Sequence, residues 1–509
     1  MPRPPSDAGA SDLAAAFADL HLDDIVRSVT ATRAAYDLAP WFSQPLTTVG
    51  AIAYRHEVFR DLDDEARIEP IRAFTGAMGM VRDRLARARK SHYRYEQERW
   101  ILDAAGAYVD AVGALSRDLD DAAFRSRGLR AFAEFLAGYR ASPEFLRLVA
   151  DTAERRAELD GVRYRLRIHG GRVVVSRYDA EPDYGAEVVA AFEKFRQGAT
   201  NEYPFDFMRS QAMNHVEAAI LDRVARLYPG IFAALDEYCA RHGDLIDPTI
   251  GRFDREIQFY VAYLEHIDRV RLAGLPFCYP DVTDVGEDVD RERESIAGRE
   301  VFDLALAGRL VTEARPVVTN DFELAGEERI LVVSGPNQGG KTTFARTIGQ
   351  LFHLARLGVP VPAAEARVHL VDAIFTHFER RENVEDLSGK LEDDLRRIQA
   401  ILARATPASL LVMNESFSST TVKDQLFIGR RVLGAIAERG PVCVVVTFLD
   451  ELSTLGPSTV SMVSSVDPEE PARRTFRITR RPADGLAYAM ALAEKHRLTY
   501  RSVKARVAA

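Results

Sequence analysis

The sequence predicts two kinds of structure in one chain: a mainly α-helical region over residues 21–285 and an α/β domain over about residues 295–509. The helical prediction rests on apolar residues that recur at three- and four-residue steps, as between residues 213 and 227. The α/β prediction rests on apolar, β-branched segments that alternate with helical patterns. A polar, charged stretch over residues 281–294 predicts a connector between the two.

Composition places limits on the class of protein. The 509 residues are enough for about two to four domains, and no apolar run approaches the roughly 20 residues of a membrane span. No apolar stretch follows the first residues to form a signal peptide, and we expect residues 1–20 to be a flexible tail. Three widely spaced cysteines lack metal-ligand spacing, which favours a reducing compartment. We therefore expect a cytoplasmic protein with no membrane partner.

One segment of the helical region has a different period. Residues 162–168 alternate between apolar and arginine side chains, His169-Gly170-Gly171 follows, and residues 172–178 return as a second apolar strand. This pattern predicts a β-hairpin. Period two places Arg163, Arg165 and Arg167 on one face and the apolar side chains on the other, where we expect them to pack on the helices.

The arginine row suits contact with a phosphate backbone. The alternative is a structural hairpin whose arginines are solvated or paired with carboxylates. The net charge of −9 argues against an indiscriminately basic nucleic-acid binder, but it allows a local basic surface of this kind. A second basic cluster, interpreted as a solvated helix face, consists of Arg82, Arg84, Arg87, Arg89, Lys90 and Arg94.

The α/β part contains a phosphate-binding motif between a strand and a helix. Residues 329–334 are apolar and β-branched, and residues 343–353 have apolar side chains at helical spacing. The segment between them matches the P-loop pattern G-x-x-x-x-G-K-[ST]. We expect ATP to be held by this loop and the residue after it: Gly335, Pro336, Asn337, Gln338, Gly339, Gly340, Lys341, Thr342 and Thr343.

The motif predicts how each part of the loop contacts ATP and Mg²⁺. Glycines let backbone N–H groups surround the phosphates, and the helix N-terminus adds the positive end of its dipole. Lys341 can reach the β- and γ-phosphates, and the Thr342 hydroxyl can ligate Mg²⁺. A glycine-rich turn without a ligand is disfavoured because both flanks are correct. The predicted fold class is therefore an α/β P-loop NTPase domain preceded by a mainly α-helical region with a small β-hairpin.

Two later strands end in polar residues suited to ATP hydrolysis. An apolar strand over residues 408–413 leads into Asn414, which we expect to hold Mg²⁺ together with Thr342. Glu415 follows as the candidate base for the attacking water, and we expect Glu415 and Lys341 to be catalytic. Asn414 carries no negative charge, which predicts weaker Mg²⁺ binding than an aspartate gives. The strand over residues 441–447 ends in residues 447–450, the usual place for a γ-phosphate sensor.

Together these motifs resemble the MutS family of DNA mismatch-repair ATPases. The Gly-Pro-Asn form of the loop at residues 335–342 is typical of that family, and residues 358–366 and 371–376 resemble the segments after it. Residues 414–421 lie where the family has Asp-Glu and a loop rich in Gly, Ser and Thr. Residues 447–452 lie where it has Thr-His-x-His-Glu-Leu. The resemblance is strong over about residues 300–509 and weaker over the helices.

The resemblance implies a homodimer in which ATP binding and hydrolysis are coupled to binding of double-stranded DNA. It also implies that the helical region is the family's lever and core, and that residues 485–506 form a dimerisation segment. By the same comparison the arginine hairpin is a reduced counterpart of the family's DNA clamp, so its arginines are candidate DNA contacts.

The chain also departs from the family pattern. Asn414 stands for an aspartate, Phe448 for a histidine, and the segment Ser388 to Glu392 lacks the family's Ser-Thr pair. We expect no counterpart of the mismatch-reading N-terminal domain, which predicts branched or otherwise distorted DNA as the ligand. The changes at Asn414, Phe448 and the Ser-Thr pair predict slow hydrolysis. One alternative is a nucleotide-gated scaffold that binds a protein partner and not DNA. A transporter-type or chromosome-maintenance ATPase is disfavoured by the Gly-Pro-Asn loop.

Overall fold

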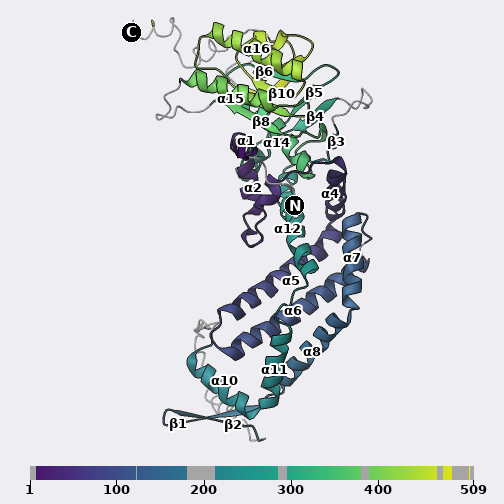
Figure 1. Cartoon of the computed structure of the whole chain (residues 1–509), viewed down its shortest axis with the longest axis vertical. Helices are drawn as coiled ribbons and strands as arrows, with labels where there is room; N and C mark the ends of the chain where they lie inside the picture. The colour runs from purple at the N-terminus through teal and green to yellow at the C-terminus, as the bar shows by residue number, and fades with distance from the viewer. Residues whose placement is uncertain are drawn as a thin grey trace, which may run out of the picture. The chain divides into compact units, whose positions relative to one another are not determined.

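The structure is a computed structural model, shown in Figure 1, and it divides into two compact units. Asp64–Glu256 form one, the helical unit, and Met1–Asp63 with Ile257–Ala509 form the other, the sheet unit. The predicted combination of a helix-rich N-terminal half and a C-terminal α/β part is confirmed. The residues described are 7–121, 123–179, 213–284, 295–379, 389–466, 474–483 and 504. No helix in these ranges is long and apolar enough to cross a bilayer.

The helical unit is built on two long antiparallel helices and the shorter ones around them. Ser126 and Ser142 cap two of these helices with their hydroxyl groups, and Asn214 forms a capping box with Glu217. One helix ends at Leu227, and Pro229 begins a new helix after one intervening residue, because proline cannot continue the hydrogen bonding of the preceding helix. The elements are α5 (Glu65–Lys90), α6 (Arg94–Asp121), α7 (Arg127–Arg140), α8 (Pro143–Asp160), β1 (Tyr164–His169), β2 (Arg172–Arg177), α10 (His215–Leu227), α11 (Pro229–Arg241) and the start of α12 (Pro248–Arg271).

The sheet unit contains a six-stranded sheet in the order β12-β11-β6-β10-β9-β8. Its strands are parallel except β12, which pairs antiparallel with β11. The strands are β6 (Ile330–Ser334), β8 (Ile374–Phe378), β9 (Leu410–Asn414), β10 (Val442–Val446), β11 (Thr459–Val466) and β12 (Arg474–Arg480). A second sheet has the order β3-β7-β4-β5, from β3 (Asp281–Thr283), β4 (Ile296–Val301), β5 (Asn320–Leu324) and β7 (Glu365–His369).

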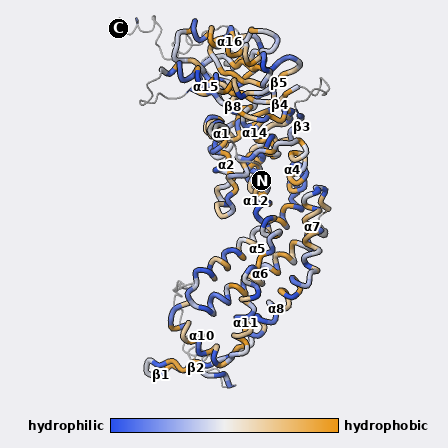
Figure 2. The backbone as a smooth tube through the Cα atoms, in the orientation of Figure 1, coloured by the Kyte–Doolittle hydropathy of each residue, from blue (hydrophilic) through white to orange (hydrophobic). Residues whose placement is uncertain are grey.

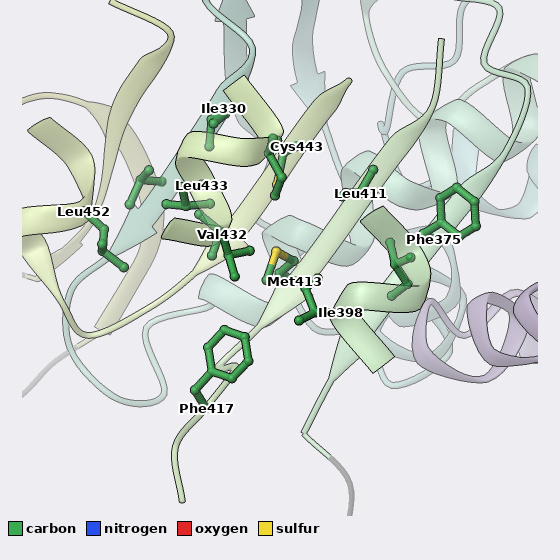
Figure 3. Close-up of a cluster of buried hydrophobic side chains, with 14 of the residues drawn as sticks. Ile330, Phe375, Ile398, Leu411, Met413, Phe417, Val432, Leu433, Cys443 and Leu452 are labelled. Carbon is green, nitrogen blue, oxygen red and sulfur yellow. The ribbon is translucent and has the colours of Figure 1, made fainter. Parts of the chain in front are cut away.

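Helices cover both faces of the six-stranded sheet. One face packs on α15 (Lys390–Arg404) and α16 (Val422–Arg439), and Figure 3 shows the apolar cluster that fills this layer, including Phe375, Met413 and Leu433. The other face packs on the buried helix α14 (Lys341–Leu357). The remaining helices are α1 (Asp7–Asp19), α2 (Leu22–Thr30), η1 (Ala34–Tyr36), α3 (Ala39–Ser43), α4 (Val49–Leu62), α13 (Leu304–Thr312) and η2 (Asp450–Thr454).

The N-terminal residues are part of the sheet unit. The sequence predicts a flexible tail over residues 1–20, whereas the structure has helix α1 over Asp7–Asp19. Leu20 is fully buried, and its backbone oxygen accepts a hydrogen bond from Gln350 Nε2 at 2.9 Å. A Cβ atom on Gly349 of α14 would lie 2.6 Å from the Leu20 side chain, so Leu20, just after α1, fits against α14 because position 349 has no side chain. These contacts, which join residues far apart in sequence, explain the difference.

Candidate functional site

The loop between β6 and α14 has a conformation that requires its glycines. Gly335 and Gly340 have φ values of 116° and 90°, in the left-handed region that side chains disfavour. A Cβ atom on Gly339 would lie 2.3 Å from Ser464 Oγ, which donates a hydrogen bond to Gly339 O at 2.7 Å. Strand β11, which carries Ser464, therefore supports the loop from behind.

Lys341 opens α14 and points back into the loop. Its Nζ atom donates hydrogen bonds to the backbone oxygens of Gly335 at 2.9 Å and Pro336 at 3.0 Å. The same atom lies 4.2 Å from the centre of the Phe448 ring. Burial lowers the pKa of Lys341 to about 8, with Arg474 lowering it further and Glu415 opposing the shift. The ammonium group is thus held in an environment that favours an approaching anion.

The ends of β9 and α14 bring two neutral oxygen donors together. Thr342 Oγ1 donates a hydrogen bond to Asn414 Oδ1 at 2.8 Å. Hydroxyl and amide oxygens are ligands that Mg²⁺ accepts, and the ion usually completes its shell with phosphate oxygens and water. No group of three or more His, Cys, Asp or Glu side chains in the described part of the chain suits a metal. These residues fit a magnesium ion that arrives with a phosphate ligand.

Glu415 begins a turn that is fixed on several sides. Glu415 and Phe417 have φ values of 50° and 65°, which non-glycine residues adopt only when their surroundings impose them. Glu415 N donates to Val446 O at 3.0 Å, and Gln425 Nε2 donates to Ser416 O at 3.2 Å. Ser416 Oγ is hydrogen-bonded to the Nδ1 atom of a buried histidine, His377, at 2.8 Å. These contacts hold the Glu415 backbone beside the loop.

A cavity of about 490 Å³ opens beside the loop, and Glu415, Lys341 and Thr342 all line it. Beyond the loop, residues of α13 line one part of it, and another part of its wall is formed by Pro316, Val317, Val318 and Phe476. Asn320 joins two parts of this wall, because its Oδ1 accepts from Ile478 N at 2.7 Å and its Nδ2 donates to Phe476 O. The sequence did not predict this wall. Its residues belong to β5, β12 and their connections, which approach the loop only through folding, and no local motif marks them.

The position expected for a γ-phosphate sensor carries a phenyl ring. Phe448 follows β10 and is 48% exposed, so its ring replaces a side chain able to donate a hydrogen bond. In the segment that lacks the family's Ser-Thr pair, Lys390 donates to Glu379 Oε1 at 2.6 Å. Ser388 lies outside the described residues, as does the predicted dimerisation segment 485–506 except for Lys504.

The predicted hairpin is present as β1 and β2, joined by Gly170 and Gly171 with positive φ values. The register pairs Arg165 with Ser176 and Arg167 with Val174, so both arginines lie on one face. Arg163 precedes β1 and donates to Asp160 O at 3.0 Å. Arg165 is partly buried and its Nε donates to Ser176 Oγ at 3.3 Å.

The expectation for the opposite face of the hairpin is wrong in part. Val162 and Val175, at its base, pack with α10 as predicted. Leu166 and Ile168 do not, since their exposed fractions are 42% and 77%. The reason is geometric, because α10 covers the base of the ribbon and ends before the tip. Alternation shows that two faces differ, but it does not show how far a helix extends beneath one of them.

The second basic cluster is engaged within the helical unit. Arg82 forms an ion pair with the buried Asp254, and Arg94 pairs with Glu98 and Asp236. Arg84 donates to Asp103 O at 2.8 Å, and Arg87 stacks over Trp100. These four arginines therefore form contacts between helices, which the interpretation of the cluster as a solvated helix face did not include.

Comparison with known proteins agrees with the motifs. The family model described as MutS domain V matches residues 331–494, which contain the loop, Asn414 and Glu415. A DNA mismatch repair protein MutS from Erythrobacter litoralis is 26% identical over 78% of this chain and 46% of that protein. The chain therefore contains a MutS domain V, and it is similar to a MutS protein over most of its length. The family match covers the sheet unit's α/β part, and the longer MutS alignment extends over the helical region as well.

Other MutS relatives match shorter segments. A DNA mismatch repair protein MutS from Chloroflexus aurantiacus is 34% identical over 24% of this chain and 13% of that protein. An Endonuclease MutS2 from Lactococcus lactis is 32% identical over 31% of this chain and 21% of that protein. The matched regions therefore span less than half the length of these MutS relatives.

Proposed function

We propose that this protein binds ATP at the loop 335–342, hydrolyses it, and couples the nucleotide state to binding of double-stranded DNA. The observation that carries the proposal is that Lys341, Thr342 and Glu415 line one cavity, and that Asn414 Oδ1 is hydrogen-bonded to the Thr342 hydroxyl. A P-loop, its metal ligands and a base are what phosphoryl transfer to water requires.

In this proposal the loop holds the phosphates and the cavity wall holds the nucleoside. Lys341 exchanges its two backbone acceptors for phosphate oxygens, which are stronger partners because they are charged. The apolar side chains of Pro316, Val317 and Phe476 offer a surface for a flat base. Mg²⁺, held by Thr342 Oγ1 and the Asn414 amide oxygen, would neutralise charge on the β- and γ-phosphates.

In the hydrolysis step, Glu415 acts as the general base for the attacking water. Its carboxylate accepts a proton from the water that attacks the γ-phosphorus, as the bond from that phosphorus to the bridging oxygen breaks and ADP leaves. Two features favour slow turnover. Asn414 adds no negative charge to hold the metal, and Phe448 offers no hydrogen bond to the γ-phosphate.

DNA binding and dimerisation rest on the similarity to MutS proteins and on the hairpin. The relatives named as DNA mismatch repair proteins support a DNA ligand, and Arg163, Arg165 and Arg167 supply positive charge on a narrow ribbon. Homodimerisation is inferred from the family. The departures at Asn414 and Phe448 also favour a second candidate, a nucleotide-gated scaffold with weak hydrolysis that binds a protein partner and not DNA.

The test is steady-state ATP hydrolysis by the wild type and by Lys341→Ala, alone and with homoduplex, mismatched or branched DNA. We expect turnover that depends on Lys341 and changes when DNA is added. Turnover no higher than that of the Lys341→Ala variant would remove the catalytic assignment. Turnover that no DNA alters, together with no binding of labelled duplex at low salt, would favour the scaffold.

A further inference from the structure

The tip of the hairpin carries aliphatic side chains that nothing in the described part of the chain covers. Ile168 is 77% exposed, and its cross-strand partner Val173 is exposed as well. Leu166 lies on the same face, two pairs nearer the base. Figure 2 shows hydrophobic residues, in orange, along part of this ribbon. A solvated β-ribbon ordinarily places polar residues here, so these side chains point to a partner.

Charge around the tip indicates what that partner is. Arg167, next to Ile168 in sequence, and Arg172, which pairs with His169, both lie on the opposite face of the ribbon from Ile168, and both are exposed. Arg163 and Arg165 extend the positive charge toward the base. No carboxylate occurs in either strand, because β1 reads YRLRIH and β2 reads RVVVSR. The hairpin tip thus combines aliphatic side chains with positive charge and carries no negative charge. Duplex DNA fits both features, because its outer phosphates are anionic and its stacked bases are apolar.

The base of the hairpin is anchored, so the tip is presented as a firm projection. Tyr228 OH donates to Arg163 O at 2.5 Å, and Arg177 donates to Leu227 O while its guanidinium lies over the Tyr228 ring. Val175 packs against α10. The paired strands restrict bending of the ribbon between this anchor and the glycine turn. Force applied at Ile168 is therefore resisted by α10 and α11.

We propose that the hairpin tip is an aliphatic wedge that enters the minor groove of duplex DNA and separates a base step at Ile168. The long side chains of Arg167 and Arg172, which leave the opposite face of the ribbon, reach the phosphates that line the groove. This inference rests on the proposed function, that the chain binds DNA, and it adds the class of DNA preferred. Apolar wedges in other minor-groove proteins unstack a step and kink the duplex, at a cost of a few kcal/mol per step. That cost is smallest where stacking is already broken, so the wedge selects gapped or mismatched duplexes over intact ones.

The test uses Ile168→Ser and a matched control, Val174→Ser. Both change an exposed aliphatic residue of the same ribbon, but Val174 lies on the opposite face, paired with Arg167. Binding is measured with labelled homoduplex and with the same duplex carrying a central gap or mismatch. End-to-end energy transfer reports bending, and 2-aminopurine beside the central step reports unstacking. Thermal unfolding and sedimentation of the free proteins check fold and oligomeric state.

We expect the wild type and Val174→Ser to bend the DNA and to prefer the gapped or mismatched duplex. Ile168→Ser should lose the bend and the unstacking signal, and its preference should fall about tenfold, as expected when an aliphatic side chain is no longer buried. A wild type that binds DNA without bending it, or an Ile168→Ser variant that behaves like wild type, overturns the wedge while the proposed function stands. An altered oligomeric state in Ile168→Ser with DNA bending intact also overturns it, in favour of a protein contact. Absence of DNA binding by the wild type overturns both.

Discussion

The loop at residues 335–340 connects a strand to a helix, and the glycine turn of the hairpin at residues 164–177 connects two strands. The two differ in how far the surrounding structure encloses them. The loop is enclosed, with Ser464 behind it, Phe448 beside Lys341 and Phe476 in the wall of its cavity. The hairpin is fixed only at its base, and its tip is exposed. The comparison suggests that the loop is shaped in advance for one small ligand. The hairpin offers a surface that a large partner must complete.

The largest effect is expected at the enclosed site. Glu415→Gln keeps the shape of the side chain and removes its basicity, so turnover should fall by roughly 10²-fold or more while ATP still binds. Single-turnover phosphate release and nucleotide titration separate the two effects. Equal loss of binding and turnover would mean that Glu415 acts through the loop structure, by way of its turn with φ 50°.

DNA binding by the hairpin should depend on the positive charge of its arginines. Replacing Arg163, Arg165 and Arg167 with Gln should weaken binding to every duplex and leave ATP binding unchanged. Each lost phosphate contact lowers the salt slope of log Kd by about one unit. The measurement is duplex affinity across a salt series. An unchanged slope would show that the arginines are structural, as the Arg165 bond to Ser176 allows for that residue.

Gly339 in the loop has no room for a side chain, whereas some other glycines of the sheet unit have room for one. Gly339→Ala places a methyl group against Ser464 Oγ and should destabilise the sheet unit by about 1–3 kcal/mol, with weaker ATP binding. Gly434→Ala in α16 is the control, because nothing lies within 4 Å of its added Cβ and alanine favours a helix. Thermal unfolding with and without ATP checks both. A Gly339→Ala protein that unfolds like wild type and binds ATP normally contradicts the enclosed loop.

Titration of Lys341 offers a smaller, graded effect. Its pKa is about 8 in the free protein because burial disfavours the charged form. Below pH 8 the ammonium is already charged and affinity should be flat with respect to this group. As pH rises above about 8, binding must take up a proton, so ATP affinity should fall by up to tenfold per pH unit. Lys341→Arg, which stays charged, should not show this fall in a titration from pH 7 to pH 9.5, a span of roughly the range in which a lysine of this pKa titrates.

The sequence predicted the centre of the site because its chemistry is local. A strand, a glycine loop and a helix place Lys341 and Thr342, and parallel strands bring Asn414 and Glu415 to the same edge of the sheet. The wall at Pro316 and Phe476 was not predicted, because it depends on the pairing of β12 with β11. Helix α1 was missed for a similar reason, since its burial depends on the close approach of Leu20 to Gly349.

In the hairpin, strand positions and turn followed from alternation and two glycines, and the register agrees with them. The exposure of Ile168 did not follow, because a period of two specifies which side chains share a face and nothing about what covers it. The helix breaks at Leu227 and the start near Pro248 were predictable because proline restricts the backbone directly.

The most direct test of the central claim, that the loop is an ATP site, is calorimetric titration of Mg²⁺–ATP into the wild type and Lys341→Ala. Lys341 is buried, and its Nζ is held by the Gly335 and Pro336 oxygens, which phosphate oxygens would replace. We expect saturable binding by the wild type and a loss of at least about tenfold in the variant, since a charge-assisted bond contributes roughly 1.5–3 kcal/mol. Thermal unfolding without nucleotide confirms that the variant is folded. Equal affinity of the two proteins, or no binding by a folded wild type, would contradict the claim.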